Sequence, residues 1–245
     1  MYILAIETTG PLCSVALLKE NQILNVKNST DQKNHLRDLT PLIKELLEEA
    51  MVDKSELDFI VASKGPGSFT GVRIGVTTAR ALGQVLEVPL VGVGTLDAFC
   101  FKPEARAQEG VVACGIINAR RGQVYGIVDG FMDGGAYMLV DVLEVLKKEV
   151  LPKGLKVQFF GDGIDAYEKE IIDILGEANY ELQKDFYFCE EQTRYQDGAS
   201  VGLAALEKIQ KGQVLAYNEL MPDYMRKAEA QQKLEAGELN ITSKS

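Results

Sequence analysis

Histidine and tryptophan are nearly missing from this chain of 245 residues, which has one histidine, His35, and no tryptophan. A metal site built on imidazoles needs at least two of them on one face, and His35 alone cannot supply that pair. A serine or cysteine peptidase needs a histidine as its base, and no nucleophile-elbow motif accompanies His35. We therefore expect neither a metal site nor peptidase activity.

Cysteine is sparse as well, because Cys13, Cys100, Cys114 and Cys189 lie far apart and form no Cys-x-x-Cys. Each sits among apolar residues as a small hydrophobe, which is typical of a protein in a reducing compartment. The chain opens with an apolar run that meets Glu7 at once, so we expect a first strand and no secretion signal. No apolar run approaches the roughly 18 residues of a membrane span. The sequence predicts a soluble, cytoplasmic protein without a membrane partner.

Basic residues are outnumbered, since 26 lysines and arginines face 36 acids and leave a net charge of −10. An acidic chain repels the phosphate backbone of nucleic acids. Two basic residues stand next to each other at three places, Arg120-Arg121, Lys147-Lys148 and Arg226-Lys227. Basic pairs of this kind are ordinary on a protein surface. We expect nucleic-acid binding by the chain alone to be weak and salt-sensitive, with stronger contact only through a partner protein.

Glycine is abundant, and its densest stretch is residues 65–75. An apolar run at 59–63 predicts a buried strand before it, and helical spacing begins at Val72. The Walker A and dinucleotide motifs both fail, because no lysine follows the glycines and the glycine spacing is one residue too long. Phosphate binding at the start of this helix remains an alternative interpretation, although no motif supports it. The loop itself comprises Gly65, Pro66, Gly67, Ser68, Phe69 and Thr70.

A ridge of small residues runs along the helix that follows. Gly71, Gly75, Ala79 and Gly83 recur every fourth residue. Such a ridge lets another element approach closely, and its low helix propensity needs compensation by packing. The ridge therefore predicts close packing either against the chain's own core or against another protein.

A second helix, ending at Ala50, carries an apolar seam with spacings of three and four residues. The seam residues are Leu36, Leu39, Ile43, Leu46 and Ala50. Part of this face must cover a sheet, and the rest predicts a contact with another helix. Pro41 should kink this helix or mark a restart capped by Thr40.

One order of elements occurs twice along the chain. Three strands, a helix, a strand, a helix and a strand fill residues 1–101 and end in a short helix, and a similar series fills 110–222. Within the second series, Asp141 and Glu144 form a capping-box pattern, and Asp162 is placed to cap the next helix. We expect two related βββαβαβα halves and a frayed tail at 223–245.

This duplicated unit is the pattern of the actin, sugar kinase and Hsp70 (ASKHA) superfamily, an α/β fold. Five motifs carry a closer resemblance: Ala5-Ile-Glu-Thr-Thr9 with Cys13-Ser-Val-Ala-Leu17, the glycine stretch 65–75, Val88-Pro-Leu-Val-Gly-Val-Gly-Thr-Leu96, Asn118-Ala-Arg-Arg-Gly-Gln-Val-Tyr125, and Pro222-Asp-Tyr-Met-Arg226. Together they resemble the TsaB family of bacterial tRNA threonylcarbamoyladenosine synthesis. The likeness spans nearly the whole chain.

The resemblance implies a non-catalytic subunit that pairs with the catalytic paralogue TsaD and works with the ATPase TsaE, while tRNA is met only through the complex. Metal-binding relatives carry His-x-x-x-His where this chain has Thr95 and Phe99. The family implies an interface of two helices per subunit, formed with TsaD or with a second copy as a heterodimer or homodimer. Its expected residues are His35, Leu36, Leu39, Ile43, Leu46, Gly71, Val72, Arg73, Gly75, Ala79, Arg80 and Gly83.

An enzyme remains the alternative, as an actin-fold ATPase or small-molecule phosphotransferase. In actin-like folds the hairpin turns at 7–13 and 118–122 would hold phosphates. Here Glu7 and Asn118 stand where relatives often have aspartate, whereas Thr8, Thr9 and Ser14 keep hydroxyl donors. We interpret the turns as ordinary hairpins or vestigial nucleotide turns. No cofactor is then required, and any ATP or ADP binding is expected to be weak or shared with partners.

Overall fold

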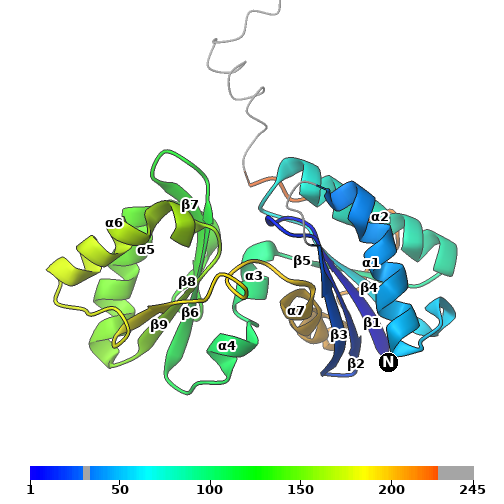
Figure 1. Cartoon of the computed structure of the whole chain (residues 1–245), viewed down its shortest axis with the longest axis horizontal. Coiled ribbons are helices and arrows are strands. Elements are labelled where there is room, and N and C mark those ends of the chain that lie inside the picture. The colour runs from blue at the N-terminus through cyan, green and yellow to red at the C-terminus, as the bar shows by residue number, and fades with distance from the viewer. Residues whose placement is uncertain (30–33, 226–245) are drawn as a thin grey trace, which may run out of the picture.

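The computed structural model describes residues 1–29 and 34–225 and contains two five-stranded sheets, each covered by helices (Figure 1). Of the tail expected at 223–245, residues 226–245 and with them the Arg226-Lys227 pair lie outside the described residues, whereas residues 223–225 are fixed by contacts to the first half and do not fray. Both sheets have the same topology: the first has the order β3-β2-β1-β4-β5, and the second, read from its other edge, has the order β8-β7-β6-β9-β10. This equivalence confirms the predicted duplication and the α/β fold of the ASKHA type.

The first half follows the predicted order closely. Its strands are β1 Tyr2–Glu7, β2 Ser14–Lys19, β3 Gln22–Asn28, β4 Leu57–Ser63 and β5 Leu90–Val93, and its helices are α1 His35–Ala50, η1 Lys54–Glu56, α2 Phe69–Leu86 and α3 Thr95–Phe99. The β1–β2–β3 strands pair antiparallel, and β4 and β5 continue the sheet in parallel with β1. Helices α1 and α2 share one face of this sheet, where their apolar side chains form a common core with β1, β2 and β4.

The second half repeats the plan. Its strands are β6 Val111–Asn118, β7 Gln123–Val128, β8 Met132–Met138, β9 Lys156–Phe160 and β10 Phe186–Phe188, and its helical segments are α4 Pro103–Arg106, α5 Leu139–Val145, η2 Leu146–Val150, η3 Leu151–Lys153 and α6 Gly163–Glu177. Helices α5 and α6 cover one face of the sheet with a core of their own. None of the helices in the described ranges is both long enough and apolar enough to span a membrane.

The last helix, α7 Gly198–Gln210, returns to the first half, so the expected boundary at residue 222 is wrong for this part of the chain. Its residues Val201, Ala204 and Ala205 are buried against Ile3 and Leu18 on the face of the first sheet opposite α1 and α2. Helical periodicity predicted the helix, but it carries no information on which of two apolar sheets the helix covers.

The two halves are joined by a buried core around α3. Phe99 stacks on Phe160 of β9 with ring centroids 6.3 Å apart, and Gly115 of β6 leaves the space that Phe99 fills. Beside this core, the buried Lys102 donates to the Thr193 carbonyl at 2.6 Å and pairs with Asp197 at 2.5 Å. Both chain crossings between the halves are thus fixed to each other by a charge-assisted contact.

The ridge of small residues on α2 packs inside the chain. Gly71, Val72, Gly75, Ala79 and Gly83 are all buried. A Cβ at position 71 would overlap the carbonyl oxygen of Thr8 in β1's turn, and the Thr8 hydroxyl donates to the Gly71 carbonyl at 2.7 Å. Of the two readings left open by the sequence, packing against the chain's own core holds, and these five residues are not a surface for a partner.

Three smaller expectations are wrong. Of the two alternatives for Pro41, the restart capped by Thr40 is wrong, because helix α1 runs continuously through Pro41. Asp141 lies inside α5, whose N-cap residue makes no side-chain cap, because the helix begins two residues earlier than the capping-box pattern suggested. Asp162 precedes α6 without capping it. A further short helix, α4, lies in the segment between the two series, for which the sequence predicted no element.

Candidate functional site

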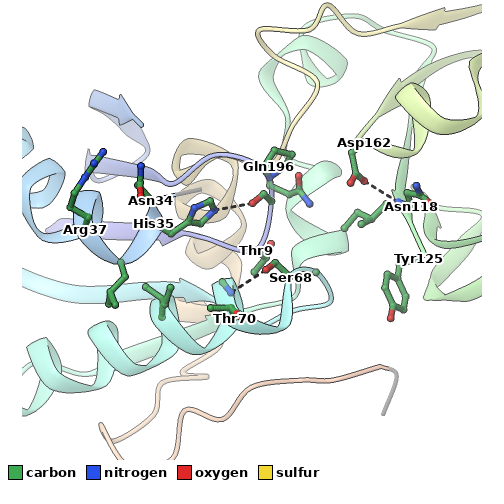
Figure 2. Close-up of a pocket in the computed structure, with 17 residues that line it drawn as sticks. Thr9, Asn34, His35, Arg37, Ser68, Thr70, Asn118, Tyr125, Asp162 and Gln196 are labelled. Atoms are coloured by element: carbon green, nitrogen blue, oxygen red, sulfur yellow. Dashed lines mark hydrogen bonds between the residues drawn. The ribbon is translucent and has the colours of Figure 1, made fainter. Parts of the chain in front are cut away.

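The glycine loop packs closely against two other segments of the chain's backbone, one at Thr9 and one at Asp223. Gly67 has a φ of 154°, and a Cβ there would lie 2.6 Å from the Thr9 carbonyl oxygen. Gly65 has a φ of 113° and packs against the carbonyl of Asp223. Ser68 caps α2 by accepting from the Gly71 N–H at 3.2 Å, and its own N–H donates to the Thr9 carbonyl at 2.8 Å (Figure 2). The close approach that the sequence predicted is thus made by internal backbone.

A segment after α7, residues 215–225, crosses the first half and is called the strap here (orange in Figure 1). Leu215 pairs with Leu90 at the edge of β5, and the Asp223 N–H donates to the Lys64 carbonyl at 2.7 Å. Leu220 is fully buried in the core under α2. The strap therefore fixes the glycine loop and reaches the start of α2.

Aromatic and basic side chains meet where the strap reaches α2. The rings of Phe69 and Tyr224 lie 4.7 Å apart, and the Arg73 guanidinium sits 4.0 Å from the Phe69 ring centre. Arg73 Nε also donates to the Tyr224 hydroxyl at 3.0 Å. All three side chains are exposed, so this cluster offers both apolar and charged groups to solvent.

Helices α1 and α2 and the strap keep large apolar side chains outside the core. Leu36 is 76% exposed, Val85 78% and Met221 61%. The strap sulfur of Met221 lies 3.9 Å from a guanidinium nitrogen of Arg80. Leu36 lies near the start of α2, beside Thr70 and Ile74, and Val85 lies near its end. Large apolar side chains exposed on neighbouring elements are typical of a protein-interaction surface. We call this set, with Phe69, Arg73 and Tyr224, the α1–α2 face.

The predicted seam of α1 divides between the core and the α1–α2 face. Leu39, Ile43 and Leu46 are buried against the sheet and are unavailable to a partner. Leu36 remains outside, and the ring nitrogen Nε2 of His35 is 3.0 Å from the Gly10 carbonyl (Figure 2). Spacing alone could not separate these residues, because both sets fall within one broad apolar stripe.

The turn after β1, expected to be a vestigial nucleotide site, is closed by internal hydrogen bonds. The Glu7 carboxylate accepts from the Thr9 N–H, from the Thr9 hydroxyl at 2.6 Å and from the Ser63 hydroxyl. The Thr95 hydroxyl donates to Thr9 at 3.2 Å. Ser14, also a proposed phosphate donor, accepts from the Gly198 N–H at 2.9 Å. The hydroxyls that could have bound phosphate are therefore buried and engaged.

Burial dominates the electrostatics of Glu7. Desolvation raises the pKa of this carboxyl above its ordinary value of 4.5, and the hydrogen bonds from Ser63 and Thr9 offset part of that rise. Glu7 is fully buried, and no basic group contributes to the shift of its pKa. Its carboxyl therefore acts as a structural hydrogen-bond acceptor. Three donors of the chain itself already bond to this carboxyl.

The corresponding turn of the second half is held by Asp162. Its carboxylate accepts from the Asn118 N–H at 2.9 Å, and the Asn118 side-chain oxygen accepts from the Arg120 N–H at 2.8 Å. Burial raises the pKa of Asp162, and the Asn118 hydrogen bond lowers it in part. Asp162, expected to cap a helix, instead connects β9's end to the β6–β7 turn.

A cleft of about 890 Å³ separates these two turns (Figure 2). Thr9, Ser68 and Gln196 line it from one side, whereas Asn118 and Tyr125 line it from the other. At the positions that the resemblance assigns to a metal-binding histidine pair, Thr95 is bonded to Thr9 and Phe99 is buried in the interdomain core. Within the described ranges, no cluster of three or more His, Cys, Asp or Glu side chains is arranged to hold a metal ion.

The fold and the two opposed hairpin turns define a duplicated α/β protein of the ASKHA class. A hexokinase of the ROK family from Thermus thermophilus shares this fold with a TM-score of 0.50 at 11% identity, over 87% of this chain and all of that one. YeaZ from Pseudomonas aeruginosa aligns with a TM-score of 0.67 at 24% identity, over 91% of this chain and 99% of that chain. These likenesses establish the fold.

Sequence comparisons establish the family. A family model described as TsaD, tRNA N6-adenosine threonylcarbamoyltransferase, matches residues 22–234. A Bacillus subtilis protein named tRNA threonylcarbamoyladenosine biosynthesis protein TsaB is 33% identical over 95% of this chain and 97% of its own length. An Escherichia coli protein of the same name is 30% identical over 62% of this chain and 64% of its own. The chain belongs to the TsaB family, as its sequence motifs indicated.

Proposed function

We propose that this chain takes part in tRNA threonylcarbamoyladenosine synthesis in the cytoplasm as a non-catalytic subunit. It binds and activates a TsaD-type catalytic paralogue, works with TsaE, and meets tRNA only in that assembly. The names of its relatives support the process. The match to the TsaD family model supports a paralogous catalytic partner.

The observation that carries the binding role is the α1–α2 face. Leu36, Val85 and Met221 expose apolar side chains although the adjoining cores are fully packed. Burying such side chains in an interface contributes roughly 1.5 to 3 kcal/mol for each one that is fully covered. The partner surface is therefore not the ridge and inner seam expected from the sequence but the outer side of the same two helices, extended by the strap. A second copy of the chain would use the same face in the absence of the paralogue.

The closed turn around Glu7 supports a non-catalytic role. An ATPase of this fold needs donors for phosphate and a carboxylate near metal-bound water, whereas the Thr8 and Thr9 hydroxyls and the Glu7 carboxylate are engaged inside the protein. The alternative of an actin-fold ATPase or phosphotransferase would require this network to open. We propose that the chain requires no cofactor and binds ATP or ADP weakly, if at all, without a partner.

A binding experiment tests the proposal on the face itself. Leu36→Asp and Val85→Asp should leave the melting temperature unchanged, because both side chains are largely exposed, and should weaken binding of the TsaD-type paralogue at least tenfold by calorimetry. Val140→Asp is the matched control, since Val140 is exposed on α5 of the second half. Equal binding by all three variants would place the partner surface elsewhere.

A further inference from the structure

The β6–β7 turn contains three consecutive residues in the left-handed region. The φ angles are 65° at Arg120, 57° at Arg121 and 72° at Gly122. Hairpin turns of this handedness favour Asn, Asp and Gly, because a longer side chain is strained there. The chain instead places two arginines at these positions. Strain of this kind persists where the surrounding structure over-determines it, and it is often functional.

The surroundings of the turn do over-determine it. The Asn118 side-chain oxygen accepts from the Arg120 N–H at 2.8 Å and from the Tyr167 hydroxyl at 3.3 Å. The Tyr167 hydroxyl in turn accepts from the Gly122 N–H at 3.2 Å. The Asp162 carboxylate also accepts from the Asn118 N–H, as described above. These hydrogen bonds fix the conformation of the turn, which carries two guanidinium groups.

Both guanidinium groups are available. Arg120 and Arg121 are exposed, and within the described ranges neither side chain has an ion pair or hydrogen bond. Other arginines are engaged, for example Arg73 with Tyr224 and Arg194 with Asp165 at 2.6 Å. On a chain with a net charge of −10, two adjacent unpaired arginines on a rigid turn are a local site for an anion.

The position of the turn indicates an extended anion. Asn118 and Tyr125, which flank the arginines in sequence, line the interdomain cleft (Figure 2), so the turn that carries the arginines adjoins the cleft. A guanidinium matches two phosphate oxygens at once, so two adjacent exposed arginines suit an anion that carries more than one phosphate group. A polyphosphate backbone running past the cleft fits this arrangement.

We propose that the Arg120-Arg121 turn is a contact site for the phosphate backbone of RNA in the assembled complex. This inference rests on the proposed function, because the acidic chain by itself holds too few basic groups for tight RNA binding. The turn supplies two phosphate contacts to an RNA whose remaining contacts come from the catalytic partner. It gives the subunit a direct part in tRNA placement.

The test exchanges the two arginines for the residues that the turn prefers. In Arg120→Asn/Arg121→Gly the charges are removed and the backbone strain is relieved, so the melting temperature should equal or exceed that of the wild-type chain and binding to the paralogue should be unchanged. The complex should bind tRNA about tenfold more weakly near 100 mM salt, and the slope of log affinity against log salt should fall by about 1.4 to 1.8. Lys147→Gln/Lys148→Gln makes the same charge change at η2 and should have little effect.

Each other outcome has a defined meaning. Unchanged tRNA affinity and slope in the arginine variant would overturn the proposal, as would an affinity loss with no change in slope. An equal loss in the lysine control would assign the effect to overall charge and would also overturn it. ATP titrated in place of RNA distinguishes a free nucleotide site, and loss of ATP binding with RNA binding intact would contradict the RNA assignment. Failure of the wild-type chain to bind the paralogue would instead refute the proposed function.

Discussion

Substitution of Gly71 by alanine should destabilise the whole chain, because the ridge on α2 is buried against β1's turn. The added Cβ would overlap the Thr8 carbonyl oxygen and lie 3.1 Å from its carbon. This obstacle is backbone, and the Thr8 hydroxyl is itself bonded to the Gly71 carbonyl, so neither side moves without breaking a buried hydrogen bond. Overpacking of a core costs roughly 1 to 3 kcal/mol, and a lost buried hydrogen bond adds about 1 kcal/mol.

The expected loss is therefore about 3 kcal/mol, which corresponds to a fall in melting temperature of roughly 6 to 12 °C for a chain of this size. Gly176→Ala in α6 is the matched control, because a Cβ there meets nothing within 4 Å. It should be neutral or stabilising by up to about 1 kcal/mol. Differential scanning calorimetry of both variants measures this difference. A Gly71→Ala chain that melts with the wild type would refute the assignment of the ridge to the internal core.

Three further predictions follow from buried polar groups and the strap. Burial raises the folded-state pKa of Glu7 above 4.5. The free energy of unfolding of the wild type should therefore fall relative to that of Glu7→Gln as pH rises above about 4.5. Urea unfolding of both chains between pH 4.5 and 8 measures this difference, and a difference that does not change with pH would disprove the prediction. Lys102→Ala, which leaves Asp197 without its buried partner, should cost about 3 to 5 kcal/mol, whereas a loss below about 1 kcal/mol would show that the pair does not tie the halves. Tyr224→Ala should weaken paralogue binding several-fold while Tyr217→Ala, nearer the start of the strap, does not, as surface plasmon resonance can measure; unchanged binding by Tyr224→Ala would remove this end of the strap from the interface.

The duplicated fold could be predicted because each half repeats strong local signals. The apolar run at 59–63, predicted as a buried strand, lies within β4 and ends with it, since a continuous apolar run meets turn residues there. The return of α7 to the first sheet could not be predicted, because the pairing of a helix with one of two similar apolar faces is a non-local choice. The strap was missed for the same reason, as Leu215 and Leu220 gain their meaning only from contact with β5 and α2.

The candidate site was predictable only in outline. The sequence predicted a partner contact on two helices, but a stripe of small or apolar residues does not reveal which side faces the sheet, and so residues that are buried in the chain, such as Ala79 and Leu46, were included in that prediction. The closure of the β1 turn depends on Ser63 and Thr95, which lie more than 50 residues from Glu7 and meet it only in the folded sheet. The residue types alone suggested turns that bind nucleotide weakly. The structure adds that the threonine hydroxyls of the first turn already take part in hydrogen bonds within the chain.

We propose that this chain activates a catalytic paralogue through the α1–α2 face and has no turnover of its own. The most direct measurement is threonylcarbamoyl transfer to tRNA by the TsaD-type paralogue with TsaE, titrated with the wild-type chain and with Leu36→Asp. We expect no product from the chain alone, a saturable rise in product on adding the wild-type chain, and a rise that needs at least tenfold more of the Leu36→Asp chain. Turnover by the purified chain alone, or equal activation by both chains, would contradict it.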